Sequence, residues 1–175
     1  LSYFNHCIAI SDKIMNLAIQ STVVKHSNIS VINNGIDISK ARAVIPRKQV
    51  RASLGFNEQD TLLIQVGWFT PVKNQDISVR AISLIKDKFP NLHLLLVGNG
   101  PRLEPVKDLA KRLSLLNRIH FLGFRRDVRN LLGAADLFLL PSSVEGLPIS
   151  LLEAYANSLP AVCTNVPGIS DTISL

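Results

Sequence analysis

From Thr61 onward, short apolar runs alternate with segments of helical periodicity, and this alternation restricts the chain to one fold class. The runs are rich in Val, Ile and Leu and most end at Gly or Pro: TLLIQVG, HLLLVG, IHFLG, DLFLLP and PAVCT. Continuous apolar strands separated by helices indicate a parallel sheet that is buried on both faces. We therefore predict an α/β protein with a doubly wound parallel sheet, a Rossmann-like half that is incomplete at both ends.

The segments between these runs are predicted to be helices. NQDISVRAISLIKDKF has a predicted core face made of Ile77, Ala81, Leu84 and Ile85. PRLEPVKDLAKRLSLL is predicted to turn Leu109 and Leu113 inward, and PISLLEAYANS to place Pro148 at the first helical position. In doubly wound sheets, ligands bind at the carboxyl ends of the strands. The architecture therefore predicts a site in the loops at 67–74, 98–101, 123–127 and 141–148.

The first part of the chain has a different pattern. CIAISDKIMNLAIQS predicts a strand and a helix with Ser11 as N-cap, and ISVINNGID predicts a strand closed by the Asn34-Gly35 turn. We predict that residues 1–28 are the remnant of a preceding domain and that 29–60 connect it to the domain at 61–175. A start without Met suggests an excerpt of a longer protein.

Composition excludes several classes of protein. A hydrophobic fraction of 47% with 18% charged residues is typical of a folded chain, and no apolar run approaches the roughly 20 residues of a membrane span. Two distant cysteines, Cys7 and Cys163, favour the reducing cytoplasm over a disulfide framework. No Cys or His pair has zinc spacing, so no structural metal is predicted.

The formal net charge of +6 leaves two interpretations open. A solvated basic face is the simpler one. The other is attraction to an anion: a nucleotide, a phosphorylated lipid or a membrane surface. Nucleic acid is not predicted as a partner, because the basic residues lack interleaved aromatic side chains.

The segment EGLPISLLEA, residues 145–154, places two carboxylates around a predicted helix start. Free amides and the helix dipole make that start suitable for a phosphate or diphosphate. A carboxylate beside a bound phosphate would be repelled by it, so Glu145 and Glu153 are expected to accept hydrogen bonds from neutral hydroxyl groups on either side of the phosphate. Eight residues span about 12 Å if helical, which suits a nucleotide sugar: ribose at Glu153, transferred sugar at Glu145.

These residues carry a resemblance. E-x7-E as EGLPISLLE resembles the signature of the family 4 retaining glycosyltransferases, which have the two-domain fold called GT-B. VINNGID, VGWFTPVKNQD, LLLVGNGP, IHFLGFRRDV and LPAVCTNVPGISD are similar to further segments of that family, in the same order. The likeness covers nearly the whole chain, and six pieces in order make it specific.

The resemblance implies a half that binds a nucleoside diphosphate sugar. Lys73 and Glu145 would be catalytic, with Lys73 neutralising the diphosphate. The implied donor-binding residues are Gly67, Trp68, Gly123, Phe124, Arg125, Gly146, Leu147, Ile149 and Glu153. Of these, Gly146, Leu147 and Ile149 would donate backbone N–H groups to the diphosphate, and Gly123, Phe124 and Arg125 would lie along the base. The family implies no metal and no cofactor, since cations and the helix dipole replace them.

Trp68 departs from the family pattern, which usually has Arg beside Gly67. An indole supplies no charge to a leaving diphosphate, and electrostatic stabilisation is often the largest catalytic contribution. Full activity of this chain is therefore in question. The 175-residue chain alone is expected to bind a nucleotide without transferring sugar, since the acceptor surface would belong to the first domain.

The implied function is transfer of a sugar, with retention, to a glycan or lipid-linked acceptor in polysaccharide or glycolipid biosynthesis. The implied location is the cytoplasm, with contact to the inner membrane face through the first domain left open. Two alternatives remain at this point: a nucleotide-sugar epimerase of the same fold, and a catalytically weakened binding domain. Simpler interpretations also remain, with Glu153 at a solvent-facing helix edge, Glu145 paired with the dipole, Gly98 and Gly100 as turn residues, and Arg125 in a solvated loop.

Overall fold

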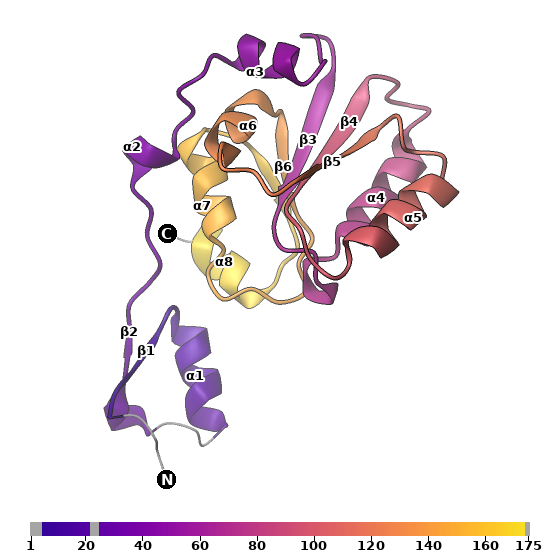
Figure 1. The fold of residues 1–175 in the computed structure, drawn as a ribbon. Coiled ribbons are helices and arrows are strands. Elements are labelled where there is room, and N and C mark those ends of the chain that lie inside the picture. The colour runs from indigo at the N-terminus through magenta and orange to yellow at the C-terminus, as the bar shows by residue number, and fades with distance from the viewer. Residues whose placement is uncertain (1–4, 22–24, 174–175) are drawn as a thin grey trace.

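The computed structural model describes residues 5–21 and 25–173 and contains a five-stranded parallel sheet (Figure 1). Its strands are β3 (Thr61–Val66), β4 (Leu92–Val97), β5 (Ile119–Gly123), β6 (Leu137–Leu140) and β7 (Ala161–Cys163). They lie in the order β5-β4-β3-β6-β7, and every neighbouring pair is parallel. This confirms the predicted doubly wound sheet. From β3 the chain first adds β4 and β5 on one side of the sheet, and then returns to add β6 and β7 on the other side of β3.

Helices cover both faces of this sheet (Figure 1). One face carries α4 (Gln75–Ile85) and α5 (Leu103–Arg112), and the other carries α6 (Val128–Ala134), α7 (Ile149–Ala156) and α8 (Pro167–Ile173). Alternate residues of β3 point to opposite faces, so Leu62 and Ile64 join one core cluster and Leu63 the other. Both faces of the sheet are therefore buried, which explains the continuous apolar runs.

The predicted core face of α4 is mostly wrong. The helix buries Gln75, Ser78, Val79 and Ile82, whereas Ile77 is 48% and Leu84 86% exposed. Ala81 is also exposed, and of the four predicted residues Ile85 alone packs against the core. Hydrogen bonds of Gln75 and Ser78 to the β3 side allow these polar residues to face inward. The face of α5 is as predicted for Leu109, which is buried, while Leu113 packs at the cluster edge.

Two predicted helix starts shift slightly. Pro148 is the N-cap of α7, whose first helical residue is Ile149, and α5 begins at Leu103 after Pro101 and Arg102. A proline at either place lacks the amide that a helix start leaves free in any case. The helical elements themselves are confirmed.

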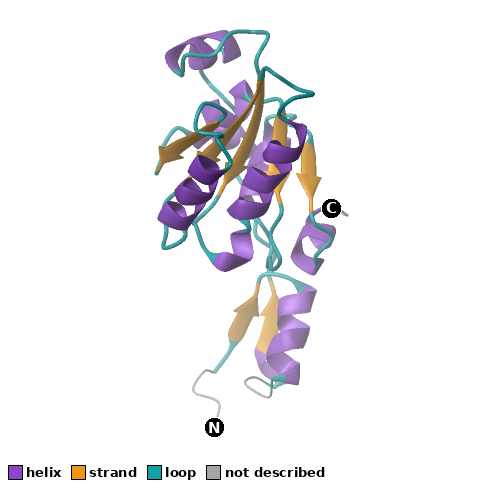
Figure 2. Cartoon of the chain, turned by 90° about the vertical axis from the view of Figure 1, so that its right-hand side faces the viewer, coloured by secondary structure: helices purple, strands orange, loops and turns teal. Residues whose placement is uncertain are grey.

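The N-terminal part forms a small unit below the larger sheet (Figure 2). Strand β1 (Cys7–Ala9) pairs in parallel with β2 (Ile29–Val31), and α1 (Asp12–Gln20) lies between them in sequence. Ser11 is confirmed as the N-cap of α1, because its Oγ accepts a hydrogen bond from the Ile14 amide at 3.3 Å. Helices α2 (Ile38–Ala41) and α3 (Arg47–Ser53) follow.

The domain boundaries proposed from the sequence are not decided by these elements. Strand β2 lies in the predicted connection, yet it pairs with β1 in the predicted remnant. Residues 1–4 and 22–24 of that remnant, and 174–175 at the other end, lie outside the described residues. Within the described ranges, no helix combines the length and the apolar character that crossing a membrane requires.

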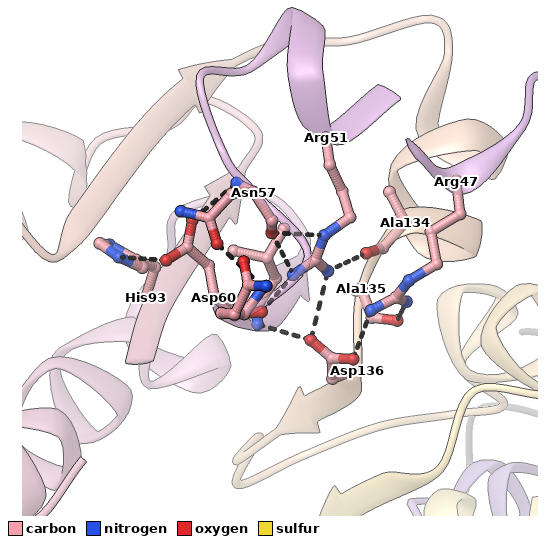
Figure 3. A network of polar contacts seen from close by, with 10 residues as sticks. Arg47, Arg51, Asn57, Asp60, His93, Ala134, Ala135 and Asp136 are labelled. Atoms are coloured by element: carbon pink, nitrogen blue, oxygen red, sulfur yellow. Dashed lines mark hydrogen bonds and ion pairs between the residues drawn. The ribbon is translucent and has the colours of Figure 1, made fainter. Parts of the chain in front are cut away.

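A buried guanidinium fastens α3 to the amino edge of the sheet (Figure 3). Arg51 has no exposed surface, and its nitrogens donate to the carbonyls of Asn57 and Ala134 at 2.9–3.1 Å and to that of Asp60. Its Nη1 also lies 3.4 Å from Asp136 Oδ2. Every donor direction of the guanidinium therefore meets protein oxygen, which a buried charge requires.

Asp136, just before β6, is the anionic centre of this network (Figure 3). Its carboxylate accepts from the Leu62 amide at 2.8 Å and from Arg47 Nη2 at 2.5 Å, in addition to Arg51. Burial alone would raise the pKa of Asp136, but these donors outweigh it and lower the pKa below its usual value. The network thus joins α3, β3 and β6 at the edge opposite their carboxyl ends.

We expect Arg51→Leu to lower the free energy of unfolding by about 3–5 kcal/mol, because it leaves buried carbonyls without their donor and removes one of the three donors to Asp136. Urea unfolding monitored by circular dichroism measures this change. Lys48→Leu on the same helix is the matched control, since Lys48 is exposed, and it should change the value by no more than about 0.5 kcal/mol. Equal losses in the two variants would contradict a dominant role for Arg51.

Candidate active site

The candidate site lies where the strand order reverses. β3 and β6 are neighbours in the sheet, but the chain leaves β3 toward β4 and leaves β6 toward β7. The loops after them, 67–74 and 141–148, therefore meet at the carboxyl edge of the sheet, where Ser143 donates to the Val72 carbonyl. This is the edge that the sequence predicted to hold the site.

Lys73 and Glu145, the two residues predicted to be catalytic, form an ion pair between these two loops. Lys73 Nζ lies 2.6 Å from Glu145 Oε1, and the side chains are 23% and 8% exposed respectively. Lys73 ends the short 3-10 helix η2 (Pro71–Lys73) after β3, and Glu145 lies in the loop after β6. An ammonium has three N–H donors, so two remain for an anion while Glu145 holds the third.

The start of α7 offers backbone donors beside this pair. Within the described part of the chain, the amides of Gly146, Leu147 and Ile149 donate no hydrogen bond to another protein group. Ile149 is the first residue of the helix, where the dipole is positive. Leu147 is buried, and its carbonyl accepts from Asn34 Nδ2 at 3.2 Å, which fixes the loop in place. The arrangement can bind an anion.

Gly67 and Trp68 follow β3. A Cβ on Gly67 would lie 3.7 Å from the Lys73 side chain, so this glycine adjoins the lysine stem. The Trp68 indole is 59% exposed, and the Trp68 carbonyl accepts from Gln75 Nε2 at 3.3 Å. Trp68 thus presents an open aromatic surface at the edge where the resemblance would place a cation.

Gly98, directly after β4, packs closely against this loop. Its φ is +134°, and a Cβ there would overlap the carbonyl oxygen of Gly67. Only a residue without a side chain allows the β4 turn to approach the β3 turn so closely. The turn interpretation of Gly98 therefore fits its packing.

Gly123, predicted with Phe124 and Arg125 to lie along the base, is the last residue of the outer strand β5, two strands from β3, and the other two follow it in the loop. The Phe124 side chain is 70% exposed. Arg125 donates to both carboxylate oxygens of Asp127 at 2.7 Å, and this hydrogen bonding raises the pKa of Arg125 and lowers the pKa of Asp127. A ligand anion at Arg125 would have to compete with Asp127.

Glu153 lies on α7 between the core residues Leu151 and Ala154. Its carboxylate has no hydrogen-bond or ion-pair partner among residues 5–21 and 25–173, and partial burial raises its pKa. Because α7 begins at Ile149, Glu145 lies in the loop, and the expected 12 Å helical spacing does not apply to the whole segment. The structure brings Glu145 to Lys73 and leaves Glu153 unpaired on the adjoining helix.

Sequence reasoning missed Gly168, which also shapes the site. Gly168 is buried in the first turn of α8, and a Cβ there would overlap the carbonyl oxygens of Glu145 and Gly146. On the other side of the loop, a Cβ on Gly146 would lie 2.7 Å from Ile10 Cδ1. The only available signal was the Pro-Gly pair in PGISD, which by itself predicts a turn. The Glu145 loop is thus enclosed by α8 and by the N-terminal unit.

Comparison with known proteins agrees on one family. A model of the family described as "Glycosyl transferases group 1" matches residues 46–175. Among curated proteins, the chain is 31% identical over 166 residues to UDP-Gal:alpha-D-GlcNAc-diphosphoundecaprenol alpha-1,3-galactosyltransferase of Escherichia coli. It is 34% identical over 128 residues to lipopolysaccharide glucosyltransferase WaaG of Escherichia coli K12. These matches cover 93% and 73% of this chain but 42% and 34% of the relatives, so the chain spans less than half of their length.

Solved structures agree with this match. Anabaena Alr3699/HepE in complex with UDP and glucose superposes with a TM-score of 0.86 at 26% identity. WaaG, described as a glycosyltransferase involved in lipopolysaccharide biosynthesis, gives 0.86 at 29%. Each superposition covers 95% of this chain and 46% of the other. The parallel sheet is that of the Rossmann-like domain of the GT-B fold.

We expect Gly168→Ala to displace the Glu145 loop, since its methyl group would meet backbone oxygens that no side-chain movement can clear. The expected loss in free energy of unfolding is about 1–3 kcal/mol, measured by urea unfolding, with a longer Lys73–Glu145 distance in a crystal structure. Gly35→Ala is the control, because nothing lies within 4 Å of its added methyl group. An unchanged Lys73–Glu145 distance in Gly168→Ala would refute the expectation.

We expect Glu153→Gln to raise the melting temperature at pH 7. A raised pKa means that the folded state favours the protonated form, so the ionised carboxylate costs stability as pH rises through the folded pKa. Below the pKa of the unfolded state the difference between variant and wild type should disappear. Thermal unfolding between about pH 3 and 8 measures it. Glu104→Gln, at an exposed glutamate paired with Lys107, should show no such gain.

Proposed function

This chain belongs to the group 1 glycosyl transferases, and on that premise we propose that it supplies the nucleotide-sugar-binding part of an enzyme that transfers a sugar to an acceptor. One observation carries the proposal. The Lys73–Glu145 ion pair joins the two loops at 2.6 Å, and the adjoining start of α7 has amides without a hydrogen-bond partner among the described residues. A cation and free amides on one side of a carboxylate suit a diphosphate next to a hydroxyl-bearing sugar.

In this proposal, the donor diphosphate lies between Lys73 and the start of α7. Negative charge grows on it as the bond to the sugar breaks, and preorganised donors stabilise that charge. Glu145 orients the Lys73 ammonium and accepts hydrogen bonds from the transferred sugar. Glu153, whose carboxylate lacks a partner in the described ranges, accepts from the ribose hydroxyls.

The remaining donor contacts follow the same placement. Gly67 lets the diphosphate approach the β3 loop, and Trp68 provides a surface on which a ring can stack. Gly123, Phe124 and Arg125 lie along the base at the end of β5. We propose that Lys73 and the α7 dipole take the place of a metal ion, so that no cofactor takes part.

We propose a uridine diphosphate sugar as donor and a glycan or lipid-linked acceptor. The support is by analogy: HepE was solved with UDP and glucose, and the galactosyltransferase relative is named for a diphosphoundecaprenol acceptor. Retention of configuration, assignment to family 4 and a role in polysaccharide or glycolipid biosynthesis rest on the E-x7-E resemblance of EGLPISLLE. A lipid-linked acceptor would place the enzyme in the cytoplasm at the inner membrane face.

The domain assignment belongs to the same proposal. Residues 61–175 would bind the donor, 29–60 would connect the domains, and 1–28 would belong to the acceptor-side domain. The family match begins at residue 46, inside the proposed connection. Transfer requires the acceptor to be held against the sugar, so the 175 residues alone should bind a nucleotide without multiple turnovers.

The epimerase alternative is not favoured, because the relatives reported above are transferases by name. A binding domain without activity remains the second candidate, and Trp68 motivates it. Incubation of the complete protein with UDP-glucose, UDP-galactose or UDP-N-acetylglucosamine and lipid-linked acceptors separates these functions. UDP release with labelled acceptor supports transfer, a changed donor sugar indicates an epimerase, and binding without either indicates the second candidate.

In the complete enzyme, Lys73→Ala should lower kcat by about 10²–10³-fold, since one preorganised charge-stabilising donor typically contributes 2.7–4 kcal/mol. Steady-state kinetics with saturating acceptor measure kcat and the donor KM separately. Lys107→Ala, which removes an exposed lysine paired with Glu104, is the control and should leave both unchanged. A raised KM with an unchanged kcat would assign Lys73 to ground-state binding instead.

A further inference from the structure

A buried polar chain lies directly behind Lys73. Gln65, the second-last residue of β3, is 2% exposed. Its Nε2 donates to the Lys73 carbonyl at 2.8 Å, and its Oε1 accepts from Ser78 Oγ at 2.7 Å. Ser78 is 3% exposed on the inner face of α4. Strand, loop and helix are thus joined through one amide side chain.

The same loop is fastened to the loop that carries Glu145. Asn74, in the left-handed region with φ 51°, donates from Nδ2 to the Pro141 carbonyl at 2.8 Å. The Ser143 amide donates to the Val72 carbonyl at 2.9 Å. The backbone on both sides of Lys73 is therefore tied to residues 141–143, two positions before Glu145. These ties and the Gln65 bond together leave the Lys73 backbone little freedom.

Burial of the Gln65 amide among apolar residues costs free energy. Its neighbours along β3, Ile64 and Leu63, are buried apolar residues, and a buried amide is tolerated only when its hydrogen bonds are satisfied. An apolar side chain would suit the core equally well. What an apolar residue would not do is hold the carbonyl of Lys73.

We propose that Gln65 is a positioning residue that sets the Lys73 ammonium against Glu145 and, in the function proposed above, against the donor diphosphate. The inference rests on that function for its kinetic consequence, while the geometric part concerns Lys73 alone. Gln65 acts through the Lys73 backbone and touches no reacting atom. A small displacement of a catalytic group can lower a rate by about a hundredfold. We therefore expect the loss of Gln65 to lower kcat.

Two substitutions separate positioning from packing. Gln65→Leu removes both hydrogen bonds and replaces the amide with an apolar side chain of similar size. Gln65→Glu keeps the shape but titrates: the protonated carboxyl donates to the Lys73 carbonyl and accepts from Ser78, as the amide does. The ionised carboxylate has no proton to donate and faces the carbonyl oxygen with negative charge.

The control is Asn130→Leu. Asn130 is also a buried amide, 5% exposed, and its Oδ1 accepts from the Val44 and Ile45 amides at 3.0 and 3.2 Å. None of its side-chain hydrogen bonds involves the loops that carry Lys73 and Glu145. It therefore reports the cost of losing a buried amide without the loss of Lys73 positioning.

The test measures kcat and donor KM of the complete enzyme across pH, with the melting temperature of each variant. We expect Gln65→Leu to lower kcat by about tenfold to a hundredfold with little change in donor KM, and Asn130→Leu to leave kcat close to wild type. The ratio of Gln65→Glu to wild-type kcat should rise as pH falls. A flat ratio, or equal kcat losses in Gln65→Leu and Asn130→Leu, would overturn the inference.

A crystal structure of Gln65→Leu provides a readout that needs no substrate. The expected result is loss of the 2.6 Å contact between Lys73 Nζ and Glu145 Oε1. If that contact is lost while the wild-type protein transfers no sugar, the positioning role holds and the proposed function fails. If the contact persists and kcat is unchanged in an active enzyme, the function holds and the positioning role is wrong.

Discussion

The structure depends on the reversal of strand order at β3. Right-handed crossovers place α4 and α5 on one face of the sheet and α6 and α7 on the other. The chain therefore departs from β3 and from its neighbour β6 in opposite directions. As a result, the loops that carry Lys73 and Glu145 meet at the carboxyl ends of these two strands. The 2.6 Å ion pair is a consequence of strand order rather than of nearness in sequence.

Fully hydrogen-bonded polar groups and polar groups without partners lie at opposite ends of the same two strands. At the amino edge, Arg51 and Asp136 fasten β3 and β6 to α3 with every donor direction satisfied. At the carboxyl edge, amides at the start of α7 and the Glu153 carboxylate lack partners within the described residues. Unsatisfied groups lower stability, and such groups are typical of functional sites in natural proteins. The paired groups thus lie at the amino edge, and the groups available to a ligand lie at the carboxyl edge.

The sequence predicted those features that depend on local pattern. Apolar runs predicted the five strands, and their Gly and Pro ends predicted the site loops, so Lys73 and Glu145 were placed at the correct edge. Contact of these residues with a donor remains a prediction. The sequence predicted α4 poorly, because Gln75 and Ser78 read as surface residues until their hydrogen-bond partners are known. The contacts of Gly168 and Gln65 could not be predicted for the same reason. Both residues matter through the groups that they contact, and those contacts are set by tertiary packing.

The close approach of Gly146 to Ile10 has a consequence for how these two positions can vary. The loop that carries Glu145 rests on the small N-terminal unit, and a methyl group added at Gly146 would lie 2.7 Å from Ile10 Cδ1. That atom is the end of a flexible side chain, so a different rotamer or a shorter residue at position 10 would make room for the methyl group. A residue larger than Gly at position 146 thus calls for a smaller residue at position 10, and the two positions are expected to vary together in sequence.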